Sequence, residues 1–250
     1  MAVADLGRAL KGGVAFLTRI PVGGSEGDWR SFQTVPAVFP AVGYLVGAVT
    51  AVPFLVLSGP AAALSYVVAL VALVGVTHLD GVADLADAAV VHDATDRRSA
   101  LKDTTTGVGA LVAVAVVVAG LALAGLALAG LSTWRAAAIV VASEVGAKLG
   151  MATVACVGTA SHDGLGAGFT RAADPPLLVG PVVVATPAAL LTGVSPAAPV
   201  AVVAGTLVAV AVVRWADEAL GGVNGDVFGA VNEIARLVAL HVGVVAWTRF

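Results

Sequence analysis

The stretch from Leu111 to Trp134 holds 24 residues and not one ionisable side chain. As an α-helix, a stretch of this length is sufficient to cross the roughly 30 Å hydrocarbon core of a bilayer. The mean hydropathy of the whole chain is +1.01, so the other apolar runs suit the same environment. The sequence therefore predicts an all-α, polytopic membrane helix bundle.

About seven transmembrane helices are expected, in a single membrane-embedded domain that covers residues 1–250. The uncharged run from Pro175 to Val213 is too long for one crossing, and Ser195 and Pro196 form the natural turn within it. Segment 1–20 carries several charges and suits an N-terminal helix that lies at the membrane interface. The expected spans are 36–57, 61–79, 107–131, 135–157, 177–193, 197–213 and 229–248.

The basic residues are divided unequally between the two sides of this topology. With the N-terminus inside, segments 1–35, 80–106, 158–176 and 214–228 share one face and hold nine Lys and Arg residues, against two on the opposite face. The positive-inside rule therefore predicts a multi-pass cell-membrane protein whose charged loops, and whose site, face the cytoplasm. The net charge of −3 and the lack of a basic block argue against a nucleic-acid partner and leave the lipid bilayer.

Three aspartates follow the second expected span at helical spacing. Asp80, Asp84 and Asp87 stand at i, i+4 and i+7, so they line one stripe if the segment continues that helix. Three like charges repel one another unless a divalent cation lies among them, and carboxylate oxygens favour Mg²⁺, Mn²⁺ or Ca²⁺. The stripe predicts a metal site, and the alternative is a solvated amphipathic turn.

A second candidate site comes just before the third span. Lys102, Asp103 and three threonines precede Gly107, where that span begins. A helix N-terminus offers free N–H groups and a positive dipole to phosphate oxygens, and glycine permits their close approach. The same residues would also serve as a helix cap without any ligand, with Lys102 marking the cytoplasmic interface.

The last expected span carries carboxylates of its own. Asp226 and Glu233 are seven residues apart and share a helix face. A carboxylate within a span suggests a functional site, although an ion pair between Glu233 and Arg236 is the structural alternative. Glu144 and Lys148 are four residues apart in the fourth span, where we expect an ion pair that faces the bundle interior.

A glycine-rich segment, from His162 to Phe169, joins the fourth and fifth spans. Its composition favours a substrate lid over a tight hairpin, because mobile loops on a rigid scaffold commonly carry binding residues. Gly164 and Gly166 are the candidate contacts in this segment.

Taken together, these segments resemble the cobalamin synthase family, the integral-membrane adenosylcobinamide-GDP ribazoletransferases. The resemblance rests on six motifs that occur in family order and cover residues 16–233. They are Phe16 to Val22, Phe39-Pro40 with Gly43 and Gly47, His78 to Asp87, Lys102-Asp103 with Gly107, Gly164-Leu165-Gly166 with Phe169, and Leu220 to Glu233.

The resemblance implies a transferase that joins adenosylcobinamide-GDP to α-ribazole, or to its 5′-phosphate, and releases GMP. It implies that the 5′-hydroxyl of α-ribazole, or an oxygen of its 5′-phosphate, attacks the phosphorus. Mg²⁺ is the expected cofactor, because phosphoryl transfer depends on positioning and charge neutralisation. Other late cobalamin-pathway enzymes are candidate partners.

The resemblance also assigns roles to residues of this chain. Asp80, Asp84 and Asp87 are the expected metal ligands, with Asp103 as a fourth. The expected catalytic residues are Asp103, Asp226 and Glu233, of which Asp226 is the candidate base and Glu233 orients it or holds a second metal. The expected substrate-binding residues are His78, Lys102, Gly107, Gly164, Gly166, Asn224 and Gly225.

The chain departs from the family pattern where that pattern has cations. Two family arginines are missing, at Thr105 and Glu144, and Asn224 stands where the family has Thr. The missing charges weaken the phosphate-binding assignments more than the metal assignments. The candidate replacements are Lys102, Lys148 and Arg171.

Two other function classes place carboxylates in a membrane bundle. A CDP-alcohol phosphotransferase also sets aspartates on adjoining helices, but its Asp-x-x-Asp-Gly-x-x-Ala-Arg run is incomplete here because Asp84 is not followed by Gly. A cation transporter would favour charges near the bilayer midplane, whereas these gather at one interface. Analysis of the reaction products separates the three classes.

Overall fold

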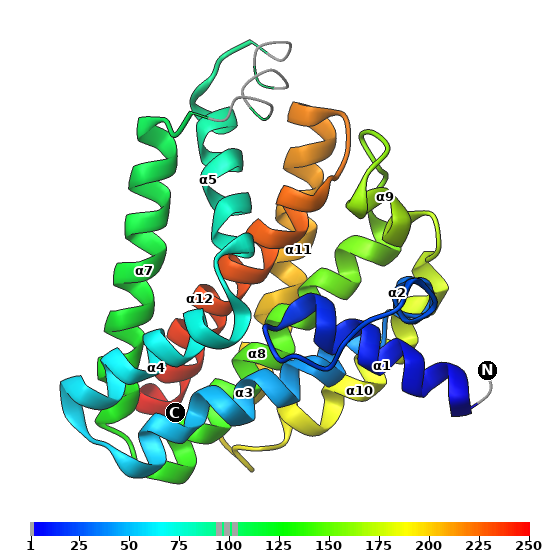
Figure 1. Ribbon diagram of the computed structural model, residues 1–250. Helices are drawn as coiled ribbons and strands as arrows, with labels where there is room; N and C mark the ends of the chain where they lie inside the picture. Colours follow the sequence, from blue (N-terminus) through cyan, green and yellow to red (C-terminus); the bar gives the residue numbers. More distant parts are fainter. Residues whose placement is uncertain (1–2, 94–96, 98–100, 102–104) are drawn as a thin grey trace.

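The computed structural model describes residues 3–93, 97, 101 and 105–250, and within them the chain is all-α, as expected, with one isolated β-bridge. Figure 1 shows the helices gathered into one bundle. In chain order they are α1 (Val3–Leu17), α2 (Glu26–Gln33), α3 (Val38–Val56), α4 (Gly59–Val74), α5 (Thr77–Val90), α7 (Val108–Ala129), α8 (Thr133–Val157), α9 (Leu165–Thr170), the 3-10 helix η1 (Pro175–Leu178), α10 (Val179–Ala189), α11 (Ala197–Leu220) and α12 (Gly225–Arg249).

In the described part of the chain, five helices are long and apolar enough to cross a membrane: α3, α7, α8, α11 and α12. The helices α4 and α5 together make a sixth candidate span if the bent pair is counted as one crossing. The expected span at 177–193 corresponds to η1 and α10, which hold only four and 11 residues and are shorter than a full crossing. At 1.5 Å per residue they reach about 22 Å, which is short of the hydrocarbon core.

The second expected span does not continue straight into the aspartate stripe. α4 ends at Val74, α5 begins at Thr77, and the two axes differ by 94°. Gly75 makes the break with φ at +81°, a conformation that side chains other than glycine rarely adopt. α5 is therefore a separate helix, and the three aspartates lie within it.

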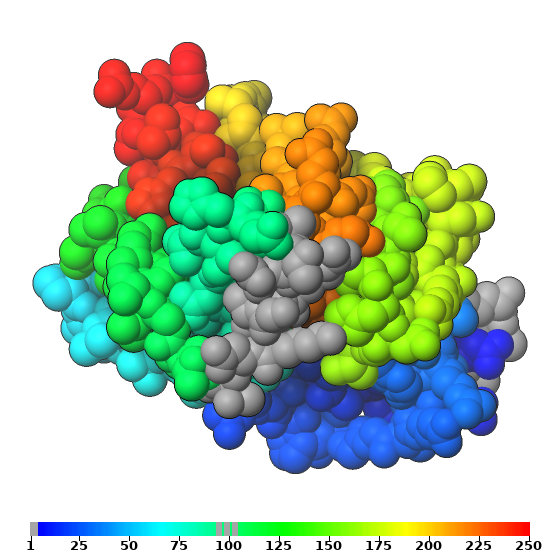
Figure 2. Space-filling model, turned by 90° about the horizontal axis from the view of Figure 1, so that it is seen from above, coloured from blue at the N-terminus to red at the C-terminus, as the bar shows by residue number. Residues whose placement is uncertain are grey.

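Several connections gather at one end of the bundle. This end is uppermost in Figure 1, where α5 and α11 reach the top of the view beside the segment that holds α9. Figure 2 looks down on the same end and shows these three parts facing the viewer. The sequence segments 80–106, 158–176 and 214–228, parts of which lie at this end, hold 16 of the 29 Asp, Glu, Lys and Arg residues.

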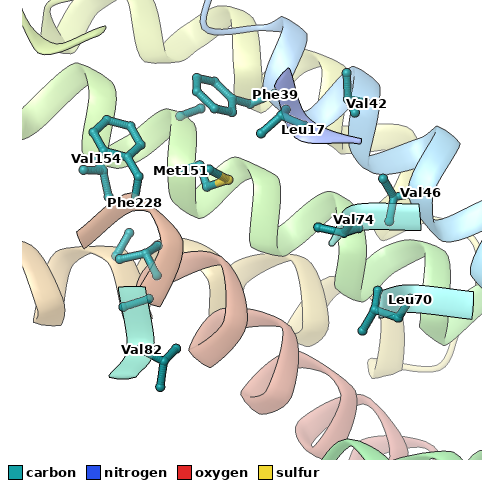
Figure 3. Packing of buried hydrophobic residues seen from close by; sticks show 14 of the residues in the cluster. Leu17, Phe39, Val42, Val46, Leu70, Val74, Val82, Met151, Val154 and Phe228 are labelled. Atoms are coloured by element: carbon teal, nitrogen blue, oxygen red, sulfur yellow. The ribbon is translucent and has the colours of Figure 1, made fainter. Parts of the chain in front are cut away.

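α8 lies at the centre of the bundle, and every residue from Ala142 to Cys156 is buried. It packs against α3 and α11, and glycines allow the closest approach: a Cβ atom added at Gly205 of α11 would lie 1.7 Å from the Gly146 oxygen of α8. Figure 3 shows side chains of this core, among them Met151 of α8 and Phe228 of α12. Such small-residue contacts are typical of helices that pack within membranes.

The two N-terminal helices pack on each other beside this core. A capping box starts α2, in which Ser25 and Asp28 exchange backbone and side-chain hydrogen bonds. The backbone N–H and then the hydroxyl of Ser25 hold the pKa of the Asp28 carboxyl below its ordinary value, and Lys11 adds an ion pair at 3.2 Å. A cluster of aromatic rings joins these helices to α3, α9 and α12: Phe16, Trp29, Phe32, Phe39, Phe169 and Phe228.

Candidate active site

Two connections that are far apart in the sequence are paired at the end of the bundle described above. Ala160 and Val223 form the parallel β-bridge, with Val223 N donating to the Thr159 oxygen at 2.7 Å and Ser161 N donating to the Val223 oxygen at 2.9 Å. Gly222 permits this approach, because a Cβ atom there would lie 2.4 Å from the Thr159 oxygen. The 158–176 and 214–228 segments therefore share one face, as the charge distribution predicts.

A cavity of about 380 Å³ opens at this pairing. It takes polar groups from the 158–164 segment and from the start of α12, and it is closed by apolar residues of α11 and of the 91–107 connection. Its lining residues are Leu101, Ser161, His162, Leu220, Gly221, Asn224 and Asp226. All three charged connections of the predicted face therefore meet at one cavity.

The aspartate helix approaches this cavity through a glycine contact. A Cβ atom at Gly81 of α5 would lie 2.6 Å from the backbone carbonyl oxygen of Asp226 at the start of α12. Asp80 is exposed and Asp84 is partly buried. The negative charges of Asp226, Asp80 and Asp87 all act on the Asp84 carboxyl, and of these Asp226 acts most strongly.

The third aspartate makes contacts that the sequence did not predict. Asp87 accepts hydrogen bonds from the backbone N–H of Gly107 at 2.7 Å and of Ala110 at 2.9 Å, and so caps the N-terminus of α7. These N–H groups are the ones that we expected to bind phosphate at Gly107, and a carboxylate of the chain already occupies them. The assignment of Asp80, Asp84 and Asp87 to a metal stays a prediction, in which Asp87 has this capping role as well.

The magnesium site itself stays a prediction. Within the described residues, no group of three or more His, Cys, Asp or Glu side chains is arranged to hold a metal ion. The expected fourth ligand Asp103 and its neighbour Lys102 lie outside the described residues. Asp80, Asp84 and Asp226 carry carboxylate oxygens, the donor type that Mg²⁺ prefers, and Asp84 and Asp226 each interact electrostatically with the other aspartates.

The start of α12 explains the asparagine of the terminal motif. The Asn224 side-chain oxygen accepts a hydrogen bond from Val227 N at 3.0 Å, and its Nδ2 donates to the Asp226 carboxylate at 2.8 Å. Asn224 therefore caps the helix and orients Asp226, and asparagine is among the strongest N-cap residues. Gly166 packs on Asn224, since a Cβ atom there would lie 2.8 Å from its carbonyl carbon, whereas Gly225 has open space around it.

Glu233 does not line the cavity but lies in a buried ion-pair network. Arg236 pairs with Glu233 on its own helix and with Glu144 of α8, donating to the second Glu144 oxygen at 3.2 Å. Lys148 lies 3.7 Å from Glu144, so the expected ion pair is confirmed. Arg236, Glu144 and Lys148 have no exposed surface, and Glu233 retains 3%.

The same network reaches the first turn of α5. Lys148 Nζ donates to Asn232 Oδ1 at 2.6 Å, and Asn232 Nδ2 lies 2.9 Å from both Glu233 Oε1 and His78 Nδ1. His78 is therefore a member of the network and does not line the cavity. Lys148, one of the candidate phosphate-binding cations, is committed to this network.

The other candidate cation, Arg171, is exposed and pairs with Asp163 at 2.5 Å.

Three residues lie in or beside the site without a role predicted from the sequence. Asn232 gave no signal, because a single amide within an apolar span carries no recognisable spacing. Ser161 precedes the predicted lid and His162 begins it, but the β-bridge that brings them to Asp226 depends on a contact between distant segments.

Comparison with known proteins finds one family and a set of relatives that share one name. The family model described as cobalamin-5-phosphate synthase matches residues 9–244. A protein of Halorubrum lacusprofundi named adenosylcobinamide-GDP ribazoletransferase is 47% identical, with 97% of this chain and 98% of the relative aligned. A protein of the same name from Haloquadratum walsbyi is 43% identical over 96% of this chain and 98% of the relative. Another, from Halobacterium salinarum, is 55% identical over 74% of this chain and 94% of the relative. No solved structure matches the chain.

Proposed function

The chain belongs to the cobalamin-5-phosphate synthase family, an enzyme family of cobalamin synthesis, and we propose that it joins adenosylcobinamide-GDP to ribazole or ribazole phosphate with release of GMP. The observation that supports this most directly is the meeting of α5 and α12 at Gly81. It brings the charges of Asp80 and Asp84 within reach of Asp226, which lines the cavity at one end of a membrane bundle.

The product named by the family constrains the attacking group. A cobalamin 5-phosphate retains the phosphate of its ribazole precursor, so that phosphate is not the nucleophile and its 5′ oxygen is not free to attack. We therefore replace the 5′ oxygen expected from the sequence with another hydroxyl of the ribose. This hydroxyl attacks the cobinamide-linked phosphorus, and the bond from phosphorus to the GMP oxygen breaks.

Roles for the carboxylates follow from their surroundings. Asp80 and Asp84 are free of helix capping and would hold Mg²⁺, which neutralises diphosphate charge when it is bound. Asp226, fixed by Asn224, supplies the negative charge that a base needs at the cavity. Asp87 and Glu233 support the site by capping α7 and by pairing with Arg236.

The cavity faces the cytoplasm in this proposal, as the distribution of basic residues suggests. A cytoplasmic opening gives nucleotide-linked substrates direct access from the compartment in which they are made. Association with other late cobalamin-pathway enzymes stays a prediction.

The test is product analysis with the purified protein in detergent, adenosylcobinamide-GDP and α-ribazole or its 5′-phosphate. We expect a cobalamin product and one equivalent of GMP, and loss of both when EDTA removes Mg²⁺. Formation of no cobalamin from either acceptor would exclude the proposed reaction. That result would leave two other activities to be tested with the same purified protein: lipid phosphotransfer, and cation transport after reconstitution into vesicles.

The metal assignment needs a readout other than turnover. Mn²⁺ binding followed by electron paramagnetic resonance should weaken in Asp84→Asn and stay unchanged in Asp217→Asn, which alters an exposed carboxylate of α11 that does not line the cavity. Equal Mn²⁺ binding by the two variants would remove Asp84 from the metal site.

A further inference from the structure

His162 is the one titratable side chain other than Asp226 among the described residues that line the cavity. It is exposed there, and its charge acts on the Asp226 carboxyl. The β-bridge between Ala160 and Val223 sets this arrangement, since the two residues lie two and three positions from His162 and Asp226. The backbone pairing therefore brings the imidazole and the carboxylate to the lining of the same cavity.

Ser161 determines which imidazole nitrogen can accept a proton. Its hydroxyl donates to the Val223 carbonyl oxygen at 3.3 Å, and that oxygen can only accept. The Ser161 oxygen, 2.9 Å from His162 Nδ1, is then left to accept the Nδ1 hydrogen. This tautomer leaves a free lone pair on Nε2.

Among the described residues, the other groups near His162 do not compete for the proton. On its own segment Asp163 is paired with Arg171 at 2.5 Å. Leu220 and Gly221 of the α11 end and Leu101 of the 91–107 connection carry no charge. Asp226 is the charged residue that α12 contributes to the described lining, and its negative charge attracts the positive charge that forms on the imidazole during transfer.

Imidazole is also better suited than a carboxylate to this step. A general base is most effective when it titrates near the working pH, and a carboxylate ordinarily titrates near pH 4, about three units below neutrality. Imidazole is the side chain whose ordinary titration range lies closest to neutral pH. A carboxylate next to an imidazole then serves best by stabilising the charge that forms.

We propose that His162 Nε2 is the proton acceptor of the transfer reaction, with Asp226 stabilising the imidazolium and Ser161 fixing the tautomer. The proton of the attacking ribose hydroxyl passes to Nε2 as the new oxygen–phosphorus bond forms. The bond from phosphorus to the GMP oxygen breaks, its electron pair stays on GMP, and the imidazolium returns its proton to water. The inference rests on the proposed function and adds the residue that moves the proton.

The experiment compares His162→Gln with His92→Gln, which alters an exposed histidine outside the cavity lining. We expect kcat of His162→Gln to fall by about 10²- to 10⁴-fold, with little change in KM, and kcat of His92→Gln to match the wild type. The wild-type rate should fall on the acid side as imidazole is protonated, and this decline should be absent in His162→Gln. Added imidazole should restore part of the rate of His162→Ala.

Two results would overturn the proposal. One is a normal kcat and pH profile in His162→Gln, and the other is a loss confined to KM, which would make His162 a phosphate-binding cation. If His162→Gln fails to accumulate, Ser161→Ala decides, because an unchanged kcat in that variant excludes the tautomer argument. A wild-type protein that forms no cobalamin would instead refute the proposed function, so the two failures are distinguishable.

Discussion

Removing Arg236 should damage the fold more than removing either of its partners. Glu144, Glu233, Lys148 and Arg236 form a buried set with two negative and two positive charges. Glu233→Gln leaves one positive charge in excess, and Arg236→Gln leaves one negative charge in excess while breaking two ion pairs. The double variant restores the balance.

The magnitude follows from the burial of the partners. Breaking a buried ion pair by removing one partner costs about 3–5 kcal/mol, because the other charge remains without compensation. We expect Glu233→Gln near the lower end of this range and Arg236→Gln at or above the upper end. The double variant should recover about 1–3 kcal/mol relative to Arg236→Gln, the usual coupling of residues in one network.

The assay combines thermal unfolding in detergent, the amount of folded protein in membranes, and the transfer reaction for the two single variants and the double. Full activity in the double variant would assign Glu233 to structure. A double variant as inactive as Glu233→Gln alone would place Glu233 in catalysis. Costs that simply add, with Arg236→Gln no worse than Glu233→Gln, would refute the network argument.

Three further outcomes follow from the structure. Asp84→Asn should abolish most of the transfer at limiting Mg²⁺ while the protein folds normally. Asp87→Asn should chiefly lower stability, by about 1 kcal/mol for a lost cap. Thermal unfolding and turnover, measured for both variants, distinguish the two effects. In a cysteine-free background, cysteines placed at Asp163 and at Ser195 should be labelled from opposite sides of the membrane; labelling from one side contradicts the paired connections. Because the pKa of Asp28 is lowered on folding, the α2 capping box should contribute stability above about pH 4 and lose it as pH falls through the lowered value. After correction for the pH dependence of intrinsic amide exchange, hydrogen-exchange protection in α2 should therefore fall at low pH, and an Asp28→Ala variant protected like wild type at pH 7 would exclude the box as a source of stability.

Hydropathy predicted most of the fold because the apolar runs are long and their ends are marked by charge. It was less accurate at 177–193, where composition is apolar but the helix stops after Ala189 and is shorter than expected. Proline-rich turns on both sides shorten the segment, and hydropathy averages do not register them. The 94° break was missed for a similar reason, since Gly75 is one residue in an otherwise continuous apolar pattern.

The candidate site was predicted in its residues but only partly in their roles. Helical spacing correctly placed Asp80, Asp84 and Asp87 on one helix, yet spacing within a helix says nothing of what faces it. Gly107 and Ala110 come to Asp87 from another helix, and this tertiary contact makes the third aspartate a cap. His162 was passed over because its partner Asp226 is 64 residues away and joins it only through the β-bridge.

The arrangement of the buried charges bears on how the protein enters the bilayer during synthesis. Glu144 and Lys148 belong to α8, and Glu233 and Arg236 belong to α12, so each helix buries one acid and one base within about a turn of each other. The buried charges of each helix can therefore balance one another as that helix inserts, before the other helix is in place. The contact between Arg236 and Glu144 then forms only when the last helix docks, which makes this ion pair a marker for completed assembly of the bundle.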